Sequence, residues 1–224
     1  MCGRFTQFST IETLKRYFPI DTVACNDIRS SYNVAPAREI LAIIRRQENV
    51  LVKLNWGLVP FWAKTPSGAS KQINARLETV AVKPSFRSAF RYRRCLIPAE
   101  GFFEWDKTGD QKQPWFITLP SKQPFAFAGL WETWNNGKAA TIYSCTILTT
   151  AASRSIEKIH QRMPVILPSE MYADWLNPDI TDLKQLESRV RQRHLKDFAA
   201  QRVSKYVNSP RNNDPKCIEP IETT

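Results

Sequence analysis

The sequence contains no long apolar segment. The longest apolar run, Phe125 to Trp131, is much shorter than the roughly 20 residues that cross a bilayer, so no transmembrane helix is expected. The first residues, Met1 to Gln7, do not form the apolar stretch and small-residue cleavage site of a signal peptide. The sequence therefore predicts a cytoplasmic protein that does not associate with membranes.

Cysteine and histidine are also scarce. The chain has 5 cysteines, widely spaced and without a Cys-x-x-Cys pair, and only 2 histidines. A disulfide framework needs paired cysteines in an oxidising compartment, and a structural zinc site needs four closely spaced ligands. The serine-hydrolase elbow, the phosphate-binding loop and the zinc-protease helix motif are absent as well. No metal and no cofactor is expected.

The composition that remains is typical of one folded, basic domain. Among 224 residues, 32 are Lys or Arg and 21 are Asp or Glu, which gives a net charge of +11, and 42% are hydrophobic. A chain of this length buries about 70% of its unfolded surface, which disfavours disorder. We predict one domain, residues 1–224, that is monomeric and frays only over about the last ten residues.

Runs rich in aromatic and β-branched residues predict strands along most of the chain. They span residues 40–44, 50–61, 94–105, 115–119, 125–134, 140–148 and 164–167. Gly109-Asp110 and Asn136-Gly137 are typical of hairpin turns, so consecutive strands are expected to pair antiparallel.

Helices are predicted at both ends of this strand-rich region. Ser9-Thr10-Ile11-Glu12 has the pattern of a capping box, with Ser9 as the N-cap of a short helix. Apolar periodicity predicts further helices over 151–159, over 169–176 and from Thr181 onward. Because strands and helices do not alternate strictly, the predicted class is α+β rather than a doubly wound parallel sheet.

Positive charge is concentrated between Arg76 and Arg94, where six cations accompany the single anion Glu78. Phe86, Phe90 and Tyr92 are interleaved with them. Cations that displace counterions and rings that stack on bases are typical of single-stranded nucleic-acid binding. The alternative is a basic solubilising face around core aromatics.

Cys2 follows the initiator methionine, and its small side chain favours removal of Met1. The product is a 1,2-aminothiol whose amine and thiol have ordinary pKa values near 8 and 8.5. An aldehyde suits this pair, because the amine condenses to an imine and the adjacent thiol then closes a thiazolidine ring. The alternative is a chance cysteine at position 2.

Two residues can supply acid–base chemistry. Glu104 is flanked by large apolar residues in Gly101-Phe102-Phe103-Glu104-Trp105, and burial there would raise its pKa toward neutrality. His160 lies between a predicted helix and a predicted strand, where a loop can direct it into a cleft. The alternatives are an outward-facing strand glutamate and a hydrogen-bonded structural histidine, the interpretation given to His194.

Three more side chains are suited to binding. Asn74 can hydrogen-bond an amine, Arg76 can pair with a phosphate, and Trp62 can wedge against a base. The alternatives are a turn asparagine, a surface salt bridge and a core tryptophan.

In combination these segments resemble the SOS response-associated peptidase (SRAP) family, whose members sense abasic sites and crosslink to DNA. The resemblance covers nearly the whole chain, and Phe103 stands where many members have tyrosine. Its motifs are Cys2-Gly3-Arg4-Phe5, Tyr32-Asn33-Val34-Ala35-Pro36, Trp56-Gly57-Leu58-Val59-Pro60, Asn74-Ala75-Arg76-Leu77-Glu78-Thr79, Arg94-Cys95-Leu96-Ile97-Pro98, the Gly101 to Trp105 block, Ile159-His160-Gln161-Arg162-Met163-Pro164-Val165, and 203–209.

The resemblance implies a single SRAP domain with a β-rich, barrel-like core, peripheral helices and a basic groove for single-stranded DNA with Cys2 at its floor. The ring-opened sugar of an abasic site offers the C1′ aldehyde that an aminothiol captures. By resemblance, Asn74 positions the Cys2 amine, Glu104 assists imine and ring formation, and His160 assists sugar ring opening and crosslink release.

The resemblance also implies a DNA path and an association with the nucleoid when the protein is bound there. The residues expected to line the path are Arg4, Asn33, Pro36, Trp62, Arg76, Trp105 and Thr149. Lyase activity is expected to be weak, because closure of the thiazolidine ring consumes the imine that a lyase reaction needs. Two alternatives stay open: a cysteine peptidase or amidohydrolase with Cys2 as N-terminal nucleophile, whose substrate could be limited to its own Met1, and a non-catalytic single-strand binding module.

Overall fold

A closed five-stranded barrel forms the centre of the protein. The computed structural model describes residues 2–106, 112–137 and 140–221, and the predicted Gly109-Asp110 turn lies outside them. Antiparallel pairing joins the five barrel strands one beside the next, and a parallel pairing between the first and the last strand of this row closes the ring. In order around the barrel they are β11 (Ile142–Ala151), β10 (Phe125–Trp134), β7 (Arg94–Ala99), β4 (Glu39–Arg45) and β5 (Asn49–Trp56).

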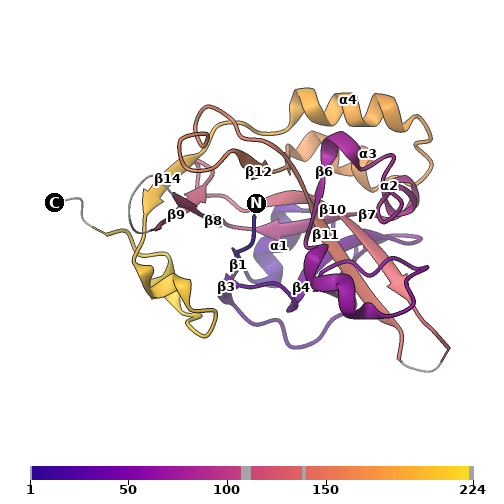
Figure 1. Ribbon diagram of the computed structural model, residues 1–224, viewed down its shortest axis with the longest axis horizontal. Helices are drawn as coiled ribbons and strands as arrows, with labels where there is room; N and C mark the ends of the chain where they lie inside the picture. The colour runs from indigo at the N-terminus through magenta and orange to yellow at the C-terminus, as the bar shows by residue number, and fades with distance from the viewer. Residues whose placement is uncertain (1, 107–111, 138–139, 222–224) are drawn as a thin grey trace.

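A second, antiparallel sheet of five strands adjoins the barrel (Figure 1). In spatial order its strands are β14 (Ala199–Arg202), β9 (Gln113–Thr118), β8 (Phe102–Asp106), β1 (Phe5–Gln7) and β3 (Ser31–Val34). β1 lies between β8 and β3, with Phe5 opposite both Phe102 and Val34. The sheet thereby places the N-terminal residues next to strand β8.

Short strands extend the barrel at its edges. β2 (Thr22–Val23) pairs with β5, and β13 (Ile166–Leu167) pairs with β10. β6 (Asn74–Arg76) runs parallel to one edge of β11, while β12 (Arg162–Pro164) runs antiparallel to the other. Residues 74–76 and 162–164 are therefore brought together across the end of β11.

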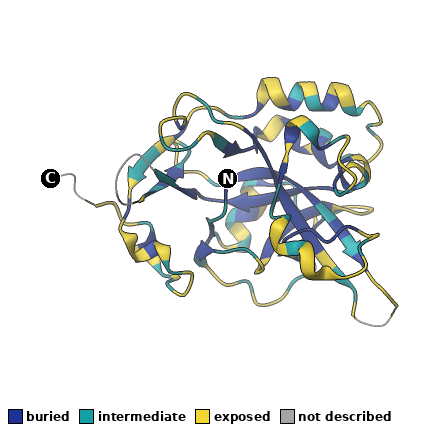
Figure 2. Cartoon of the chain, viewed as in Figure 1, coloured by how far each residue is buried: buried dark blue, intermediate teal, exposed yellow. Residues whose placement is uncertain are grey.

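Helices cover the outside of the barrel, and strand residues alternate between its two faces. In β4, Ile40, Ala42 and Ile44 join the cluster inside the barrel, whereas Leu41 and Ile43 join the cluster under the helices. Figure 2 shows the resulting continuous burial of the barrel strands. The helices are α1 (Ile11–Tyr17), α2 (Arg87–Tyr92), α3 (Tyr172–Leu176) and α4 (Leu183–Arg193), with 3₁₀ turns η1 (Pro66–Lys71), η2 (Leu77–Thr79), η3 (Ser169–Met171), η4 (Lys205–Asn208) and η5 (Pro215–Cys217).

The predicted α+β class and barrel-like core are confirmed, and the Asn136-Gly137 turn joins the antiparallel pair β10–β11. Several boundaries were wrong. The run 50–61 ends as a strand at Trp56, because Gly57 (φ +139°) turns the chain. The run 94–105 forms β7 and β8, which belong to different sheets. The predicted helix 151–159 is instead the end of β11 and a loop closed by the hydrogen bond from Ala152 N to Gln161 O (3.0 Å).

The ends of the chain also differ from expectation. The N-cap of α1 is Thr10, whose hydroxyl accepts from Thr13 N, while the backbone of Ser9 donates to the buried Glu100 (3.1 Å). Near the C-terminus, fraying was expected from Pro215 onward. The described part of that segment packs instead, since Cys217 is fully buried and Pro220 forms a bridge with Val203.

The basic cluster between Arg76 and Arg94 divides into an exposed part and a structural part. Arg94 is buried and donates hydrogen bonds to four backbone carbonyls, those of Phe90, Arg91, Trp175 and Asn177. Burial lowers the pKa of Arg94 to about 10. Phe86 and Phe90 are core residues, so of the three interleaved aromatics only Tyr92 is exposed. None of the helices in the described ranges is long and apolar enough to span a membrane.

Candidate functional site

Cys2 lies at the start of the second sheet with its side chain fully buried. The pairing of β1 with β8 holds it there, reinforced by the hydrogen bond from Phe103 N to Arg4 O (2.9 Å). Burial, followed by the negative charge of Glu104, raises the pKa of the Cys2 thiol well above its ordinary value. The thiol is therefore protonated at neutral pH and close enough to Glu104 to interact electrostatically.

Asn74 reaches Cys2 from strand β6, on the barrel side of the site. Its Nδ2 donates a hydrogen bond to the Cys2 carbonyl oxygen over 2.8 Å. Its Oδ1 is buried and has no hydrogen-bond partner among the described residues. The position of Asn74 is fixed by the register of β6 against β11, where it lies opposite Ile147. The amide thus touches the Cys2 backbone and retains one free acceptor beside it.

Glu104 and His160 form the acid–base part of the site. Glu104, on β8, is only 3% exposed, which excludes the interpretation as an outward-facing strand residue. His160 Nε2 lies 4.0 Å from Glu104 Oε2. The Nδ1 atom of His160 lies within hydrogen-bond distance of both the backbone oxygen (2.9 Å) and the backbone nitrogen (3.0 Å) of Arg162, which leaves Nε2 facing Glu104.

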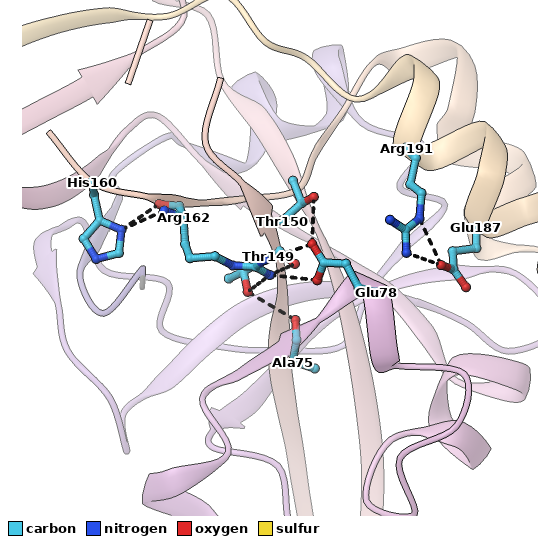
Figure 3. Close-up of polar contacts among 8 residues, drawn as sticks. All are labelled: Ala75, Glu78, Thr149, Thr150, His160, Arg162, Glu187 and Arg191. Atoms are coloured by element: carbon cyan, nitrogen blue, oxygen red, sulfur yellow. Dashed lines mark hydrogen bonds and ion pairs between the residues drawn. The ribbon is translucent and has the colours of Figure 1, made fainter. Parts of the chain in front are cut away.

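Arg162 and Glu78 fix the loop that carries His160 (Figure 3). The Arg162 guanidinium donates to both carboxylate oxygens of Glu78, at 2.8 and 3.0 Å, and to the carbonyl oxygen of Thr149 at 2.7 Å. Burial alone would raise the pKa of Glu78, but its hydrogen bond to Arg162 and the charge of that residue hold the pKa below its ordinary value. Sequence reasoning assigned no role to this ion pair, although both residues belong to the motifs of the family.

Arg4 and Asn33 connect the Cys2 segment to the C-terminal residues. Arg4 Nη1 donates to Asn33 Oδ1 (2.7 Å) and to Val207 O (2.9 Å), and its guanidinium lies 5.7 Å from the Trp105 ring centroid. Asn33 is buried, and its Nδ2 lies within hydrogen-bond distance of three backbone carbonyls, those of Val207, Ser209 and Asn212. In this structure the Asn33 side chain is committed to protein contacts rather than exposed for DNA.

The other residues predicted along a DNA path differ in accessibility. Trp62 is 54% exposed, so it is not a core residue, and its Nε1 donates to Pro84 O (3.4 Å). Arg76 is exposed, and Pro36 and Trp105 are half-buried. Thr149 is fully buried, opposite Arg76 in the β11–β6 ladder. Arg76 and Trp105 therefore present surface near the site, whereas Thr149 contributes through its contact with Arg162.

The structure brings all four predicted catalytic residues into one site. Cys2, at the start of the second sheet, has an amide on its carbonyl oxygen and a carboxylate–histidine pair beside its thiol. These features define a protein with a cysteine-centred site close to its N-terminus. A family model described as SOS response associated peptidase (SRAP) matches residues 1–210, and the chain belongs to this family.

Its relatives share nearly the whole domain. The abasic site processing protein YoqW of Bacillus subtilis is 46% identical over 98% of this chain and 99% of its own length. The abasic site processing protein YedK of Escherichia coli is 32% identical over 99% of this chain and all of its own. A crystal structure of a Bacteroides thetaiotaomicron protein superposes with a TM-score of 0.85 at 25% identity, covering 99% of this chain and 100% of that one.

Proposed function

We propose that this protein processes abasic sites in single-stranded DNA by forming a covalent crosslink through Cys2. The observation that carries the proposal is the position of Cys2, whose carbonyl oxygen accepts a hydrogen bond from Asn74 and whose buried thiol interacts with the charge of Glu104. Relatives spanning the same domain are named as abasic site processing proteins, which supports the same substrate class. Removal of Met1 would complete the site by freeing the Cys2 amine.

The chemistry follows from the 1,2-aminothiol. The amine adds to the C1′ aldehyde of the ring-opened deoxyribose, and loss of one water molecule gives an imine. The thiol sulfur then adds to the imine carbon, its proton passes to the nitrogen, and a five-membered thiazolidine closes. Because both nucleophiles belong to one residue, the second addition is intramolecular.

Each neighbouring residue has a distinct part in the proposed reaction. Asn74 holds the Cys2 carbonyl and offers Oδ1 to the amine, which orients the nitrogen lone pair toward the aldehyde. Glu104 accepts and returns protons during imine and ring formation. His160, with its Nε2 facing Glu104, assists sugar ring opening and the reverse reaction that releases the crosslink.

The DNA strand is held by the surface residues around this site. Arg76 is exposed at the end of β6, two residues beyond Asn74, where it can pair with a phosphate. Trp105, below the Arg4 guanidinium, and the exposed Trp62 offer rings for bases. Thr149 and Asn33 support this surface from beneath rather than contacting the strand.

The test is to incubate the purified protein with a single-stranded oligonucleotide carrying one abasic site, followed by denaturing gels and intact mass spectrometry. We expect an adduct on Cys2 of the protein lacking Met1, with the mass of both partners minus one water. Cys2→Ala should abolish the adduct and retain DNA binding, whereas Cys25→Ala, at a partly exposed cysteine away from the site, should leave it unchanged. An undiminished adduct in Cys2→Ala would refute the mechanism.

A peptidase with Cys2 as nucleophile is the rival function that the family description suggests. Turnover of peptide substrates by the Met1-free protein, without an adduct on abasic DNA, would favour the peptidase. Equal binding of intact and abasic strands with no covalent product would favour a binding module.

A further inference from the structure

A polar cavity of about 450 Å³ opens beside strand β3, next to the site, with which it shares Asn33. Its walls come from the segment before β3, from the start of β4 and from the C-terminal residues around Arg211. None of its lining residues is aromatic, so it lacks the surface on which a nucleobase would stack.

The charge in this cavity is positive. Four cations line it, Arg29, Arg38, Lys53 and Arg211, against the two acids Asp27 and Glu39. Arg29 Nε pairs with Asp27 Oδ1 at 2.9 Å, and this hydrogen bond and charge lower the pKa of Asp27. With that pair neutralised, Arg38, Lys53 and Arg211 remain against Glu39.

Asn213 adds a neutral donor that is held in a fixed orientation. Its Oδ1 accepts three hydrogen bonds, from Ser31 Oγ (2.9 Å), Tyr32 N (2.8 Å) and Asn33 N (2.9 Å). The side-chain oxygen is thereby committed to β3, and the Nδ2 donors are left for the cavity that Asn213 lines. A positive cavity with a fixed amide donor is suited to an oxyanion.

The cavity shares a wall with the Cys2 site. Asn33 lines it, and the same side chain accepts the Arg4 hydrogen bond of 2.7 Å two residues from Cys2. An extended strand bound at Cys2 can therefore place a more distant phosphate here. The absence of a stacking ring favours backbone recognition, because phosphates carry the charge and bases carry the π-face.

We propose that this cavity binds a backbone phosphate of the DNA strand whose abasic site lies at Cys2, with Arg38 and Arg211 as its main cationic contacts. The inference rests on the proposed function, which it extends with a second anchoring point on the strand. Its ligand chemistry is a phosphate, and the two sources to distinguish are a phosphodiester of the strand and a free nucleotide.

The experiment compares binding of an undamaged strand of about 20 nucleotides, longer than the roughly 4–16 nucleotides of typical single-strand sites. Fluorescence anisotropy is recorded over a salt series for wild type and for Arg38→Gln combined with Arg211→Gln, both exposed residues. Lys184→Gln combined with Arg193→Gln, on the exposed face of α4, is the matched control.

Loss of two phosphate contacts should reduce the salt slope by about 1.4 and weaken binding about 25-fold at 0.1 M salt, since each single-strand contact contributes about 0.7 to the slope. The control pair should match wild type. Glu39→Gln, which removes the opposing charge, should strengthen binding. Unchanged affinity and slope in the Arg38/Arg211 variant would overturn the proposal.

Two further measurements distinguish a failure of the cavity proposal from a failure of the proposed function. A trinucleotide with a central abasic site has phosphates only next to the abasic sugar and none for the more distant contact, so the Arg38/Arg211 variant should form its adduct at the wild-type rate. If wild type forms no adduct with either length, the proposed function fails, while the anisotropy comparison still decides whether the cavity binds a strand. If a deoxynucleoside monophosphate binds wild type but not the variant, and strand affinity is unchanged, the cavity holds a free nucleotide and the strand assignment is wrong.

Discussion

Replacing Asn74 by alanine removes the polar side chain that touches the Cys2 backbone. The lost hydrogen bond, 2.8 Å from Nδ2 to the Cys2 carbonyl, is neutral, and such a bond contributes about 0.5–1.5 kcal/mol. At about 1.4 kcal/mol per tenfold, crosslinking slows about 2- to 12-fold if only this bond positions the nucleophile. If the buried Oδ1 also accepts from the Cys2 amine, two bonds are lost and the expected slowing is about 5- to 140-fold.

The assay is single-turnover crosslinking with protein in excess over a single-stranded oligonucleotide that carries one abasic site. Intact mass spectrometry of each variant must show that Met1 has been removed, because a retained Met1 would also block the amine. Asn55→Ala is the matched control, since Asn55 is an exposed strand asparagine that donates to a backbone carbonyl, Tyr143 O, at 3.3 Å. A wild-type rate in Asn74→Ala would refute the assigned role of the amide.

Two further predictions concern the ion pair and the buried thiols. Glu78→Gln weakens the anchor of Arg162, so adduct formation should slow about 2- to 5-fold while urea unfolding shows a loss of no more than about 1 kcal/mol, the range of a partly exposed pair. If the free energy of unfolding falls by more than the activation free energy of crosslinking rises, the ion pair acts in folding alone. Burial raises the pKa of all five thiols, and it does so most strongly for Cys2, Cys95 and Cys145, the three considered next. Because the unfolded thiols ionise first, their contribution to stability is complete below their unfolded pKa near 8.5 and falls as the pH rises above it, by about 1.4 kcal/mol for each thiol at pH 9.5. Urea unfolding under reducing conditions at pH 7.5 and 9.5 should therefore differ by about 4 kcal/mol, and equal stabilities would contradict the buried thiols.

Local sequence patterns predicted the strands whose apolar runs are buried in the barrel. The apolar run 40–44 became the centre of β4, and 125–134 became β10, because barrel strands are buried on both faces and need continuous apolar sequence. The segment 151–159 has helical spacing, but β11 continues through Ala151 and tertiary pairing with β12 overrides the local preference.

The catalytic candidates were predictable as residue types, whereas their supporting contacts were not. Cys2 was identified by its position and its aminothiol chemistry, and Glu104 by its apolar neighbours. Nothing local to Glu78 or Arg162 indicates that the two residues pair, since 84 positions separate them and β11 lies between β12, which carries Arg162, and β6, which precedes the turn that carries Glu78. Arg94 shows the reverse case: its place in a basic run indicated a surface cation, but the folded chain buries it as a hydrogen-bond donor to backbone carbonyls.

The sequence by itself determined the reactive group, the α+β class and the positive charge, because each depends on residue identity or on short-range patterns. The tertiary structure alone decided that Asn74 meets the Cys2 carbonyl and that His160 faces Glu104. It also decided that Asn33 supports Arg4 from beneath. These contacts join residues on or beside β-strands that are distant in the chain, and only the pairing and register of the strands in the barrel and in the second sheet bring them together.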